Sequence, residues 1–272
     1  MKKILIAIAV ILFSILASCS DYLWQIRPTL DNRWDPDNPD YSIPEAIPTE
    51  GLEAAYLFNN TRQDSSGNGL HLTGVADTYA ADRFGIDLGA MIFDGSNDYL
   101  VVPDPDLGKF SATVPKTISF WFKTNGGDDM AILGHSSYHG SGGWSLLFSS
   151  SSFHFTTAGG TETVSISGFT DSEWHHAVIM NTDFEITFYL DGLNGSYGWN
   201  NELNEYETID TREITYPIEA EQYFFIGARY TNYDWNPDEV GDFYSGYIDD
   251  LRIYSKALTE DEIAALYIEK SM

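Results

Sequence analysis

Residues 117–123 have the sequence Thr117-Ile-Ser-Phe-Trp-Phe-Lys123, and this stretch decides the fold class. Ile118, Phe120 and Phe122 occupy alternate positions, with Ser119 and Trp121 between them. Successive side chains of a β-strand point to opposite faces of the sheet, so the three apolar residues share one face. The pattern predicts a half-buried strand whose apolar face contributes to a core.

The same alternation recurs along the chain. Residues 184–190 repeat it, and a turn at Asp191-Gly192 follows. Other short apolar runs between turn residues predict strands near 53–58, 89–94, 98–102, 130–135, 144–148, 152–157, 162–167, 174–180, 222–228 and 243–254. Many short strands at regular spacing predict an all-β fold, a two-sheet antiparallel β-sandwich.

One short helix is predicted at the C-terminus. Thr259 and Glu262 have the spacing of a capping box, in which each side chain bonds the other residue's backbone N–H. Ile263, Leu266 and Tyr267 follow at helical spacing. The sequence therefore predicts that a helix closes the chain after the last strand.

The first residues predict export from the cytoplasm. Lys2 and Lys3 precede an apolar run to Leu16 that is shorter than the roughly 20 residues of a membrane-spanning helix. The run ends in Ala17-Ser18-Cys19, which resembles the lipobox of bacterial lipoproteins. That resemblance implies a signal peptide over residues 1–18, a lipid on Cys19, and anchoring to a lipid bilayer in the bacterial cell envelope.

Residues 19–50 are expected to form a lipidated, flexible tether. The stretch 31–40 is rich in Asp, Asn and Pro and shows no hydrophobic period, so it cannot bury enough apolar surface to order itself. Cys19 is the single cysteine, so the exported domain is expected to fold without an intramolecular disulfide.

The formal net charge is −27, from 14 basic and 41 acidic residues. Loss of Lys2 and Lys3 with the signal peptide leaves 12 basic residues and a net charge of −29. A field of this sign repels phosphate backbones, which argues against nucleic acid as a partner. The carboxylates either form a solvated surface or, in part, bind Ca²⁺, a cation that prefers oxygen ligands.

Several further segments carry a family resemblance. They are Ala55-Tyr-Leu-Phe58, Asp64-Ser-Ser-Gly-Asn-Gly-Leu-His71, Phe93-Asp-Gly-Ser-Asn-Asp-Tyr-Leu100, Trp174-His-His-Ala-Val178, Phe188-Tyr-Leu-Asp-Gly192 and Tyr247-Ile-Asp-Asp-Leu-Arg-Ile-Tyr254. With residues 117–123 they resemble, in the same order, the laminin-G-like jelly-roll domains of the concanavalin A-like lectin/glucanase superfamily. The resemblance implies one such domain over residues 51–270. It implies no single function, because this fold hosts lectins, adhesion modules and hydrolases.

A metal site is the first candidate for chemistry. Asp249 has the parity of Leu251 and Ile253, which predicts that its carboxylate points inward and needs a partner. The family resemblance implies a structural Ca²⁺ held by Asp64, Asn68, Asp249 and Asp250. The alternative is that Asp249 meets backbone N–H groups or Arg252, and that Asp64 caps a turn.

Catalysis is the second candidate. Related hydrolases carry carboxylates at alternate positions of one strand, as in Glu-x-Asp-x-Glu, so that two of them flank a glycosidic bond. The sequence has no such row. Trp174-His175-His176 raises the question of a triad or a zinc site, but we favour a structural role at the start of a core strand. We therefore predict no enzymatic activity, with a divergent glycoside hydrolase as the less favoured alternative.

Binding is the third candidate, because sugar sites combine aromatic platforms with amide and carboxylate groups. Two segments interleave aromatic residues with Asn or Asp. They supply the predicted ligand-binding residues Tyr197, Trp199 and Asn200, and Tyr230, Tyr233 and Trp235. We predict a surface-tethered, non-catalytic module that binds glycans through these loop aromatics. The alternatives are a protein–protein or adhesion module, and aromatic residues that only cover the end of the sandwich.

Overall fold

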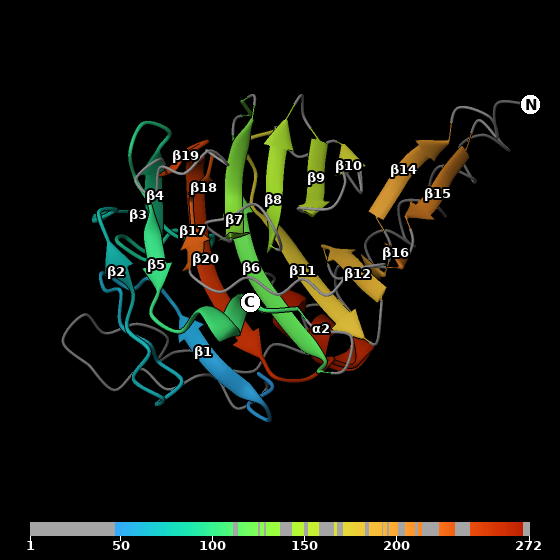
Figure 1. The fold of residues 1–272 in the computed structure, drawn as a ribbon, viewed down its shortest axis with the longest axis horizontal. Coiled ribbons are helices and arrows are strands. Elements are labelled where there is room, and N and C mark those ends of the chain that lie inside the picture. Colours follow the sequence, from blue (N-terminus) through green and yellow to red (C-terminus); the bar gives the residue numbers. More distant parts are fainter. Residues whose placement is uncertain are drawn as a thin grey trace, which may run out of the picture. The chain divides into compact units, whose positions relative to one another are not determined.

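The computed structural model describes residues 47–110, 114–124, 126–127, 129–136, 143–149, 152–157, 166–167, 171–182, 185–191, 193–194, 196–200, 205–209, 212–213, 223–231 and 240–268. The main elements of this structure are two antiparallel sheets that pack face to face (Figure 1). The predicted all-β sandwich with a C-terminal helix is confirmed.

The first sheet is built around β6, whose sequence is the alternating stretch described above. The order of its strands is β13 (Leu193–Asn194), β12 (Glu185–Leu190), β11 (His175–Thr182), β6 (Lys116–Lys123), β20 (Ser245–Tyr254), β4 (Ala90–Asp94) and β3 (Thr78–Ala80). Two further strands join its long members: β1 (Leu52–Tyr56) pairs with β20, and β16 (Arg212–Glu213) pairs with β12. The N- and C-terminal strands of the domain are therefore direct neighbours.

The second sheet takes its strands mostly from the middle of the chain. Their order is β10 (Ile166–Ser167), β9 (Ser152–Thr157), β8 (Gly143–Ser149), β7 (Met130–Ser136), β17 (Tyr223–Ile226), β5 (Leu100–Val102) and β2 (Thr73–Gly74). A short 3-10 helix, η1 (Pro105–Gly108), follows β5. Two hairpins stand outside the sheets: β14 (Ser196–Asn200) with β15 (Glu205–Ile209), and β18 (Arg229–Tyr230) with β19 (Val240–Gly241).

The main core lies between the two sheets. Ile118, Phe120 and Phe122 of β6 are fully buried there, as the alternation predicted. From the second sheet, Phe224 and Ile226 of β17 enter the same cluster. Burial of aromatic and branched side chains from both inner faces is the main favourable term that holds the sandwich together.

A second core lies on the outer side of the first sheet, under the helix α2 (Glu260–Ile268). Ile263 and Leu266 of α2 pack against Val178 and Tyr254, whose strand positions point away from the main core. The capping box is confirmed, since Thr259 N donates to Glu262 Oε2 at 2.8 Å and Glu262 N donates to Thr259 Oγ1 at 3.3 Å.

The packed chain begins before Gly51. Ile47 is 4% exposed and belongs to the second core, and residues 42–271 form one compact unit. In the described ranges no helix is long and apolar enough to cross a membrane. The predicted signal peptide, Cys19 and most of the predicted tether lie outside the described residues, so these predictions stay as they were.

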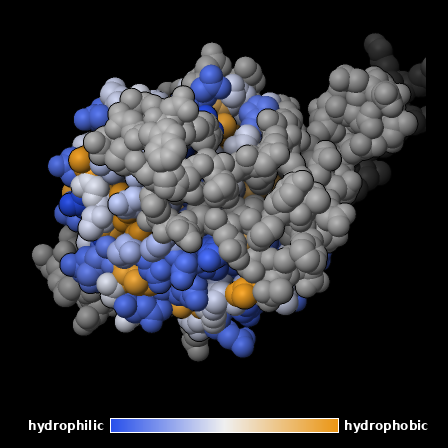
Figure 2. Space-filling view, in the orientation of Figure 1, coloured by the Kyte–Doolittle hydropathy of each residue, from blue (hydrophilic) through white to orange (hydrophobic). Residues whose placement is uncertain are grey.

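The described surface is mostly hydrophilic on the face shown in Figure 2, and apolar residues occupy small separate areas there. Large apolar side chains that are strongly exposed are few among the described residues: Val75, Leu88, Val114 and Tyr223.

Candidate functional site

The second sheet presents an aromatic cluster on its outer face. The alternation of β17 sends Phe224 and Ile226 into the core, so Tyr223 and Phe225 point the other way. Tyr223 is 43% exposed, which is unusual for a large aromatic residue on a regular strand. Phe225 is nearly covered, and its cover consists of other aromatic rings.

Four rings form this cluster, which we call the aromatic face: Tyr99, Tyr223, Phe225 and Tyr230. Phe225 is its centre, with ring centroids 5.8 Å from Tyr99, 5.7 Å from Tyr223 and 5.1 Å from Tyr230. Tyr223 and Tyr230 also meet edge to face at 5.8 Å. Edge-to-face and tilted contacts at these distances are favourable, so the rings fix one another in position.

The hairpin β18–β19 borders the aromatic face. Gly134 of β7 makes this approach possible, because a Cβ there would lie 2.7 Å from the Ala228 carbonyl oxygen and 2.8 Å from Arg229 Cβ. An ion pair between Arg229 Nε and Asp242 Oδ2, at 2.6 Å, ties the two sides of the hairpin together. The hairpin therefore holds Tyr230 against Phe225 through backbone contact as well as ring packing.

The predicted binding residues fall into three groups. Tyr230 lies in the aromatic face, and the sequence that links β18 to β19 contains Tyr233 and Trp235, which lie outside the described residues. Tyr197, Trp199 and Asn200 were expected in a loop, but the backbone forms strand β14, paired with β15.

Sequence reasoning missed three members of the cluster: Tyr99, Tyr223 and Phe225. The signal was present in Tyr223-Phe-Phe-Ile226, because a strand with apolar residues at every position must present two of them on the outer face. Which pair faces outward, and that Tyr99 of a distant segment would join them, required the pairing of β17 with β5.

Asp64, the first predicted calcium ligand, is engaged in hydrogen bonds that stabilise the turn in which it lies. Its carboxylate accepts hydrogen bonds from the N–H groups of Ala55, Ser66 and Leu70 at 2.9–3.1 Å. Burial alone would raise the pKa of Asp64, but these hydrogen bonds outweigh it and the pKa is lowered. Asn68 donates from its side-chain amide to the carbonyl oxygen of Glu53 at 2.9 Å.

Asp249 does not face the main core, contrary to the parity argument. Between Asp249 and Arg252 the strand β20 takes three steps while β6 takes two, from Trp121 to Ser119. This β-bulge contains Asp250 in a left-handed conformation, with φ 46°, and it reverses the parity of the residues on its two sides. Ile248 therefore points inward, as do Leu251 and Ile253, while Asp249 points outward.

Arginine side chains occupy the space in front of these two carboxylates. Arg83 bonds both Asp249, at 2.6 Å, and Asp250, and Arg252 lies 3.3 Å from Asp250. Burial opposes the charge of Asp250, but the guanidinium groups of Arg252 and Arg83 lower its pKa. Burial and the neighbouring Asp250 raise the pKa of Asp249. Arg83, one of the four side chains of this ion-pair network, also stacks on Trp121, with its Cζ atom 5.0 Å from the centroid of the indole ring.

The donor set does not fit a calcium shell as the residues stand. Asp64 caps its own turn, as the alternative predicted, and its carboxylate accepts from three N–H groups and the Ser66 hydroxyl. Asp249 is bound to Arg83, a partner that neither interpretation of the sequence named, and Asp250 is bound to Arg83 and Arg252. Within the described ranges no three His, Cys, Asp or Glu side chains come together as metal ligands. We assign no step of any mechanism to calcium, and its presence stays a prediction.

The two consecutive histidines have structural surroundings. His175 is held between carboxylates, with Nδ1 2.9 Å from Asp191 and Nε2 3.1 Å from Asp171. His176 is buried, and its Nε2 lies 2.8 Å from Ser119 Oγ. Burial lowers the pKa of His176 to about 3, and the cations Arg83 and Arg252 add to this effect. Since both members of the Ser–His pair are buried, a substrate cannot reach them.

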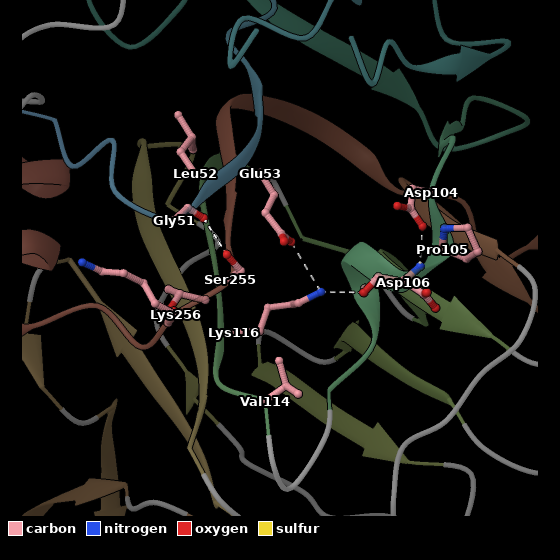
Figure 3. A network of polar contacts seen from close by, with 12 residues as sticks. Gly51, Leu52, Glu53, Asp104, Pro105, Asp106, Val114, Lys116, Ser255 and Lys256 are labelled. Atoms are coloured by element: carbon pink, nitrogen blue, oxygen red, sulfur yellow. Dashed lines mark hydrogen bonds and ion pairs between the residues drawn. The ribbon is translucent and has the colours of Figure 1, made fainter. Parts of the chain in front are cut away.

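A polar network ties the start of the domain to its middle (Figure 3). The Lys116 ammonium donates to the carbonyl oxygen of Asp106 in η1 and lies 3.8 Å from the Glu53 carboxylate of β1. Burial lowers the pKa of Lys116, although the charge of Glu53 opposes the shift. The network joins β1, β6 and η1 and leaves the aromatic face untouched.

Comparisons with known proteins agree with this architecture. A family model described as the concanavalin A-like lectin/glucanases superfamily matches residues 94–264. A search of curated proteins finds no match.

Solved structures share the fold at low sequence identity. The binding domain of Paraclostridial Mosquitocidal Protein 1 has 17% identity and a TM-score of 0.59, over 81% of this chain and 52% of that one. Domain 4 of AbnA, a GH43 extracellular arabinanase from Geobacillus stearothermophilus, solved with arabinotriose, has 20% identity and a TM-score of 0.52, over 79% and 98%. The binding domain of botulinum neurotoxin DC, solved with SialylT, has 14% identity and a TM-score of 0.56, over 82% and 52%. The chain spans about half the length of these toxin binding domains.

Proposed function

We propose that this chain, which belongs to the concanavalin A-like lectin/glucanase superfamily, is a non-catalytic module that binds carbohydrate on its aromatic face. The observation that carries the proposal is Tyr223, a strand residue that stays 43% exposed beside three further aromatic rings. A contiguous exposed apolar surface on a folded protein often marks an interaction site. The family itself contains both lectins and enzymes, so the choice between binding and catalysis has to rest on the residues of the site.

The chemistry of the cluster suits a sugar. Pyranose and furanose rings have an apolar face of C–H groups, which stacks on an aromatic ring, and the tyrosine hydroxyls can exchange hydrogen bonds with sugar hydroxyls. Tyr223 is held from below by Phe225 and from the side by Tyr230. Because the platform is ordered before binding, little side-chain entropy is lost when a ligand stacks on it.

The strands of the second sheet also argue for binding without catalysis. Hydrolysis of a glycosidic bond uses two carboxyl groups on either side of that bond. The strands β2, β5, β7, β8, β9, β10 and β17 contain no Asp and no Glu. A carboxylate pair on the floor of this face is therefore absent from these strands, in a chain with 41 acidic residues.

The similar structures add support of a limited kind. The arabinanase domain is described in complex with arabinotriose, and one toxin binding domain in complex with SialylT. Another structure shows the same toxin domain in complex with rat synaptotagmin II, a protein. At these identities the likeness concerns the fold, so the choice of a glycan rests on the aromatic face.

The point where the chain enters the domain is compatible with presentation at a surface. Ile47 packs under α2 on the outer side of the first sheet, while the aromatic face lies on the outer side of the second sheet. We extend the proposal to a lipid anchor on Cys19. Labelling of cells with a radioactive fatty acid should mark the chain, and a Cys19→Ser variant should lose the label.

The proposal is tested on a glycan array with the chain from Cys19 to Met272. A Tyr223→Ala variant should lose most of the binding. Its melting temperature should fall by only a few degrees, because the two ring contacts that it loses contribute about 0.5–1.5 kcal/mol each. Val114→Ala is the matched control: Val114 is 51% exposed, and its carbonyl oxygen accepts a bond from Asn181 of the first sheet. It should bind like the parent.

Three results would count against this function. Tyr223→Ala could bind like the parent, Val114→Ala could lose binding as well, or the array could give no signal at all. The last outcome would favour the protein–protein alternative, in which the same rings form a hot spot.

A further inference from the structure

The second sheet carries no charge on any of its strands. The sequences of β2, β5, β7, β8, β9, β10 and β17 contain neither Asp and Glu nor Lys and Arg. The first sheet differs, since β6 contains Lys116 and Lys123 and β20 contains Asp249, Asp250 and Arg252. Charge is thus confined to one layer of the sandwich, and the layer with the aromatic face is free of it.

Several connecting segments also lack cations. Residues 137–142, 150–151 and 158–165 link β7, β8, β9 and β10, and none of them is Lys or Arg. The segment 231–239, between β18 and β19, contains three acidic residues and no basic one. Arg62 donates to the Gly74 carbonyl oxygen of β2, the edge strand farthest along the sheet from β10. The sequence of these four connections therefore supplies carboxylates and hydroxyls, and no Lys or Arg.

Arg229 is the one cation in the hairpin that borders the aromatic face, within the described part of that hairpin. Its Nε lies 2.6 Å from Asp242 Oδ2, and both side chains are partly buried. A guanidinium held by a carboxylate at this distance has its charge largely compensated, so it offers little attraction to an incoming anion.

From these observations we infer that the ligand of the aromatic face is a neutral glycan, and that glycans with carboxylate or sulfate groups are rejected. This inference rests on the proposed function. An anionic sugar brought to this face would lose water from its charge without gaining a cation in return. The net charge of −27 would repel it as well, whereas a neutral sugar ring meets neither cost.

The experiment uses pairs of ligands that share a backbone and differ in charge. One pair is polygalacturonate and its fully methyl-esterified form, and the other is glucuronoxylan and unsubstituted xylan. Dissociation constants of the chain from Cys19 to Met272 are measured by isothermal titration calorimetry at 50 mM and 500 mM NaCl. Neutral members should bind at least as tightly as acidic members in each pair that binds, and their affinity should not depend on salt.

One variant tests whether the ion pair of Arg229 is what excludes acidic glycans. Asp242→Asn keeps a residue that tolerates the left-handed φ of 51° at this position, and it removes the partner of Arg229. The freed guanidinium should raise the affinity for the acidic member relative to that for the neutral member by about fivefold at low salt. Tyr223→Ala should weaken both members alike.

The outcomes separate the two proposals. If an acidic glycan binds more tightly than its neutral partner and Tyr223→Ala abolishes that binding, the aromatic face binds glycans and the inference about charge is wrong. If Asp242→Asn leaves acidic ligands unaffected, the ion pair is not what excludes them, and the inference loses its mechanism. If no glycan of either kind binds, the proposed function fails and the inference fails with it.

Discussion

Arg83 and Asp249 lie 166 residues apart in the chain and form an ion pair with 2.6 Å between Nη1 and Oδ2. Both side chains are almost completely buried on the outer side of the first sheet, and Arg83 also bonds Asp250. The pair fastens the segment before β4 to the bulge of β20. It explains why a strand of the sheet can carry two consecutive carboxylates.

The first prediction concerns this pair. Arg83→Met should lower the free energy of unfolding by about 3–5 kcal/mol, because removing one partner leaves buried carboxylates uncompensated. The measurement is urea unfolding at pH 7. Glu50→Gln is the control, since Glu50 pairs with Lys256 but is 88% exposed, and a pair of this kind adds little. Equal stability of Arg83→Met and the parent would contradict a stabilising role of Arg83 toward the two carboxylates.

The second prediction concerns acid sensitivity. Burial lowers the pKa of His135 to about 4, and that of His176 to about 3. Both stay neutral in the folded chain at a pH where the unfolded chain, with a pKa near 6.5, takes up protons. Between pH 6.5 and about 4 each histidine should therefore reduce stability by up to about 1.4 kcal/mol per pH unit as the pH falls.

Urea midpoints measured from pH 7.5 to 4.5 test this, with His135→Gln compared to the parent. The variant should lose less stability over this range than the parent does, whatever its stability at pH 7.5. Parallel curves for the two proteins would show that His135 does not resist protonation in the folded chain.

The third prediction concerns His175, which should act in the opposite direction. Burial lowers its pKa, but the hydrogen bonds to Asp191 and Asp171 outweigh burial and raise it above the ordinary value. The stabilisation of the folded state by protonated His175 is then fully present below pH 6.5. It is lost as the pH rises through the pKa of His175 in the folded chain. His175→Gln should differ from the parent more at pH 5.5 than at pH 8.5. A constant difference would mean that neither carboxylate stabilises the imidazolium.

The fourth prediction concerns Gly227, which connects β17 to the hairpin of the aromatic face. Its φ is +83°, and a Cβ would lie 2.4 Å from two ring carbons of Phe93. Gly227→Ala should cost about 1–3 kcal/mol for the steric overlap, and about 1 kcal/mol more for the left-handed backbone. Gly67→Ala isolates the backbone part, because Gly67 has a φ of +93° and open space around it. Similar losses in thermal or urea unfolding would refute the steric argument.

The fifth prediction concerns calcium. Because guanidinium groups face Asp249 and Asp250, and N–H groups saturate Asp64, we expect the same melting temperature in EDTA and in Ca²⁺. A lower melting temperature in EDTA that Ca²⁺ reverses would establish a metal site. Asp64→Ala would then identify whether the predicted turn contributes to it.

Sequence patterns were sufficient wherever the interaction is local. The alternation of residues 117–123 located β6 and its inward face, and the spacing of Thr259 and Glu262 located the start of α2. Both signals arise within a few residues of the chain. The predicted strand 222–228 extends past the end of β17 at Ile226, since strand ends depend on a partner for their hydrogen bonds.

Asp249 shows where such patterns fail. Its parity with Leu251 predicted an inward carboxylate, and one extra residue in β20 reversed the outcome. A bulge is defined by the strand beside it, so its position is not written in the alternation of β20 alone. Arg83, the partner that makes the outward position tolerable, comes from a segment with no sequence relation to β20.

The amino-acid sequence by itself determined the class of fold, the helix cap and the absence of charge from the strands of one layer, because each of these depends on neighbouring residues only. The tertiary structure alone decided which outward aromatics meet, since Tyr99, Phe225 and Tyr230 come from three separate segments that touch only in the folded domain. It also decided that the predicted calcium ligands meet guanidinium and N–H groups. Contacts between distant segments depend on register, and a shift of one residue moves every side chain of a strand to the other face.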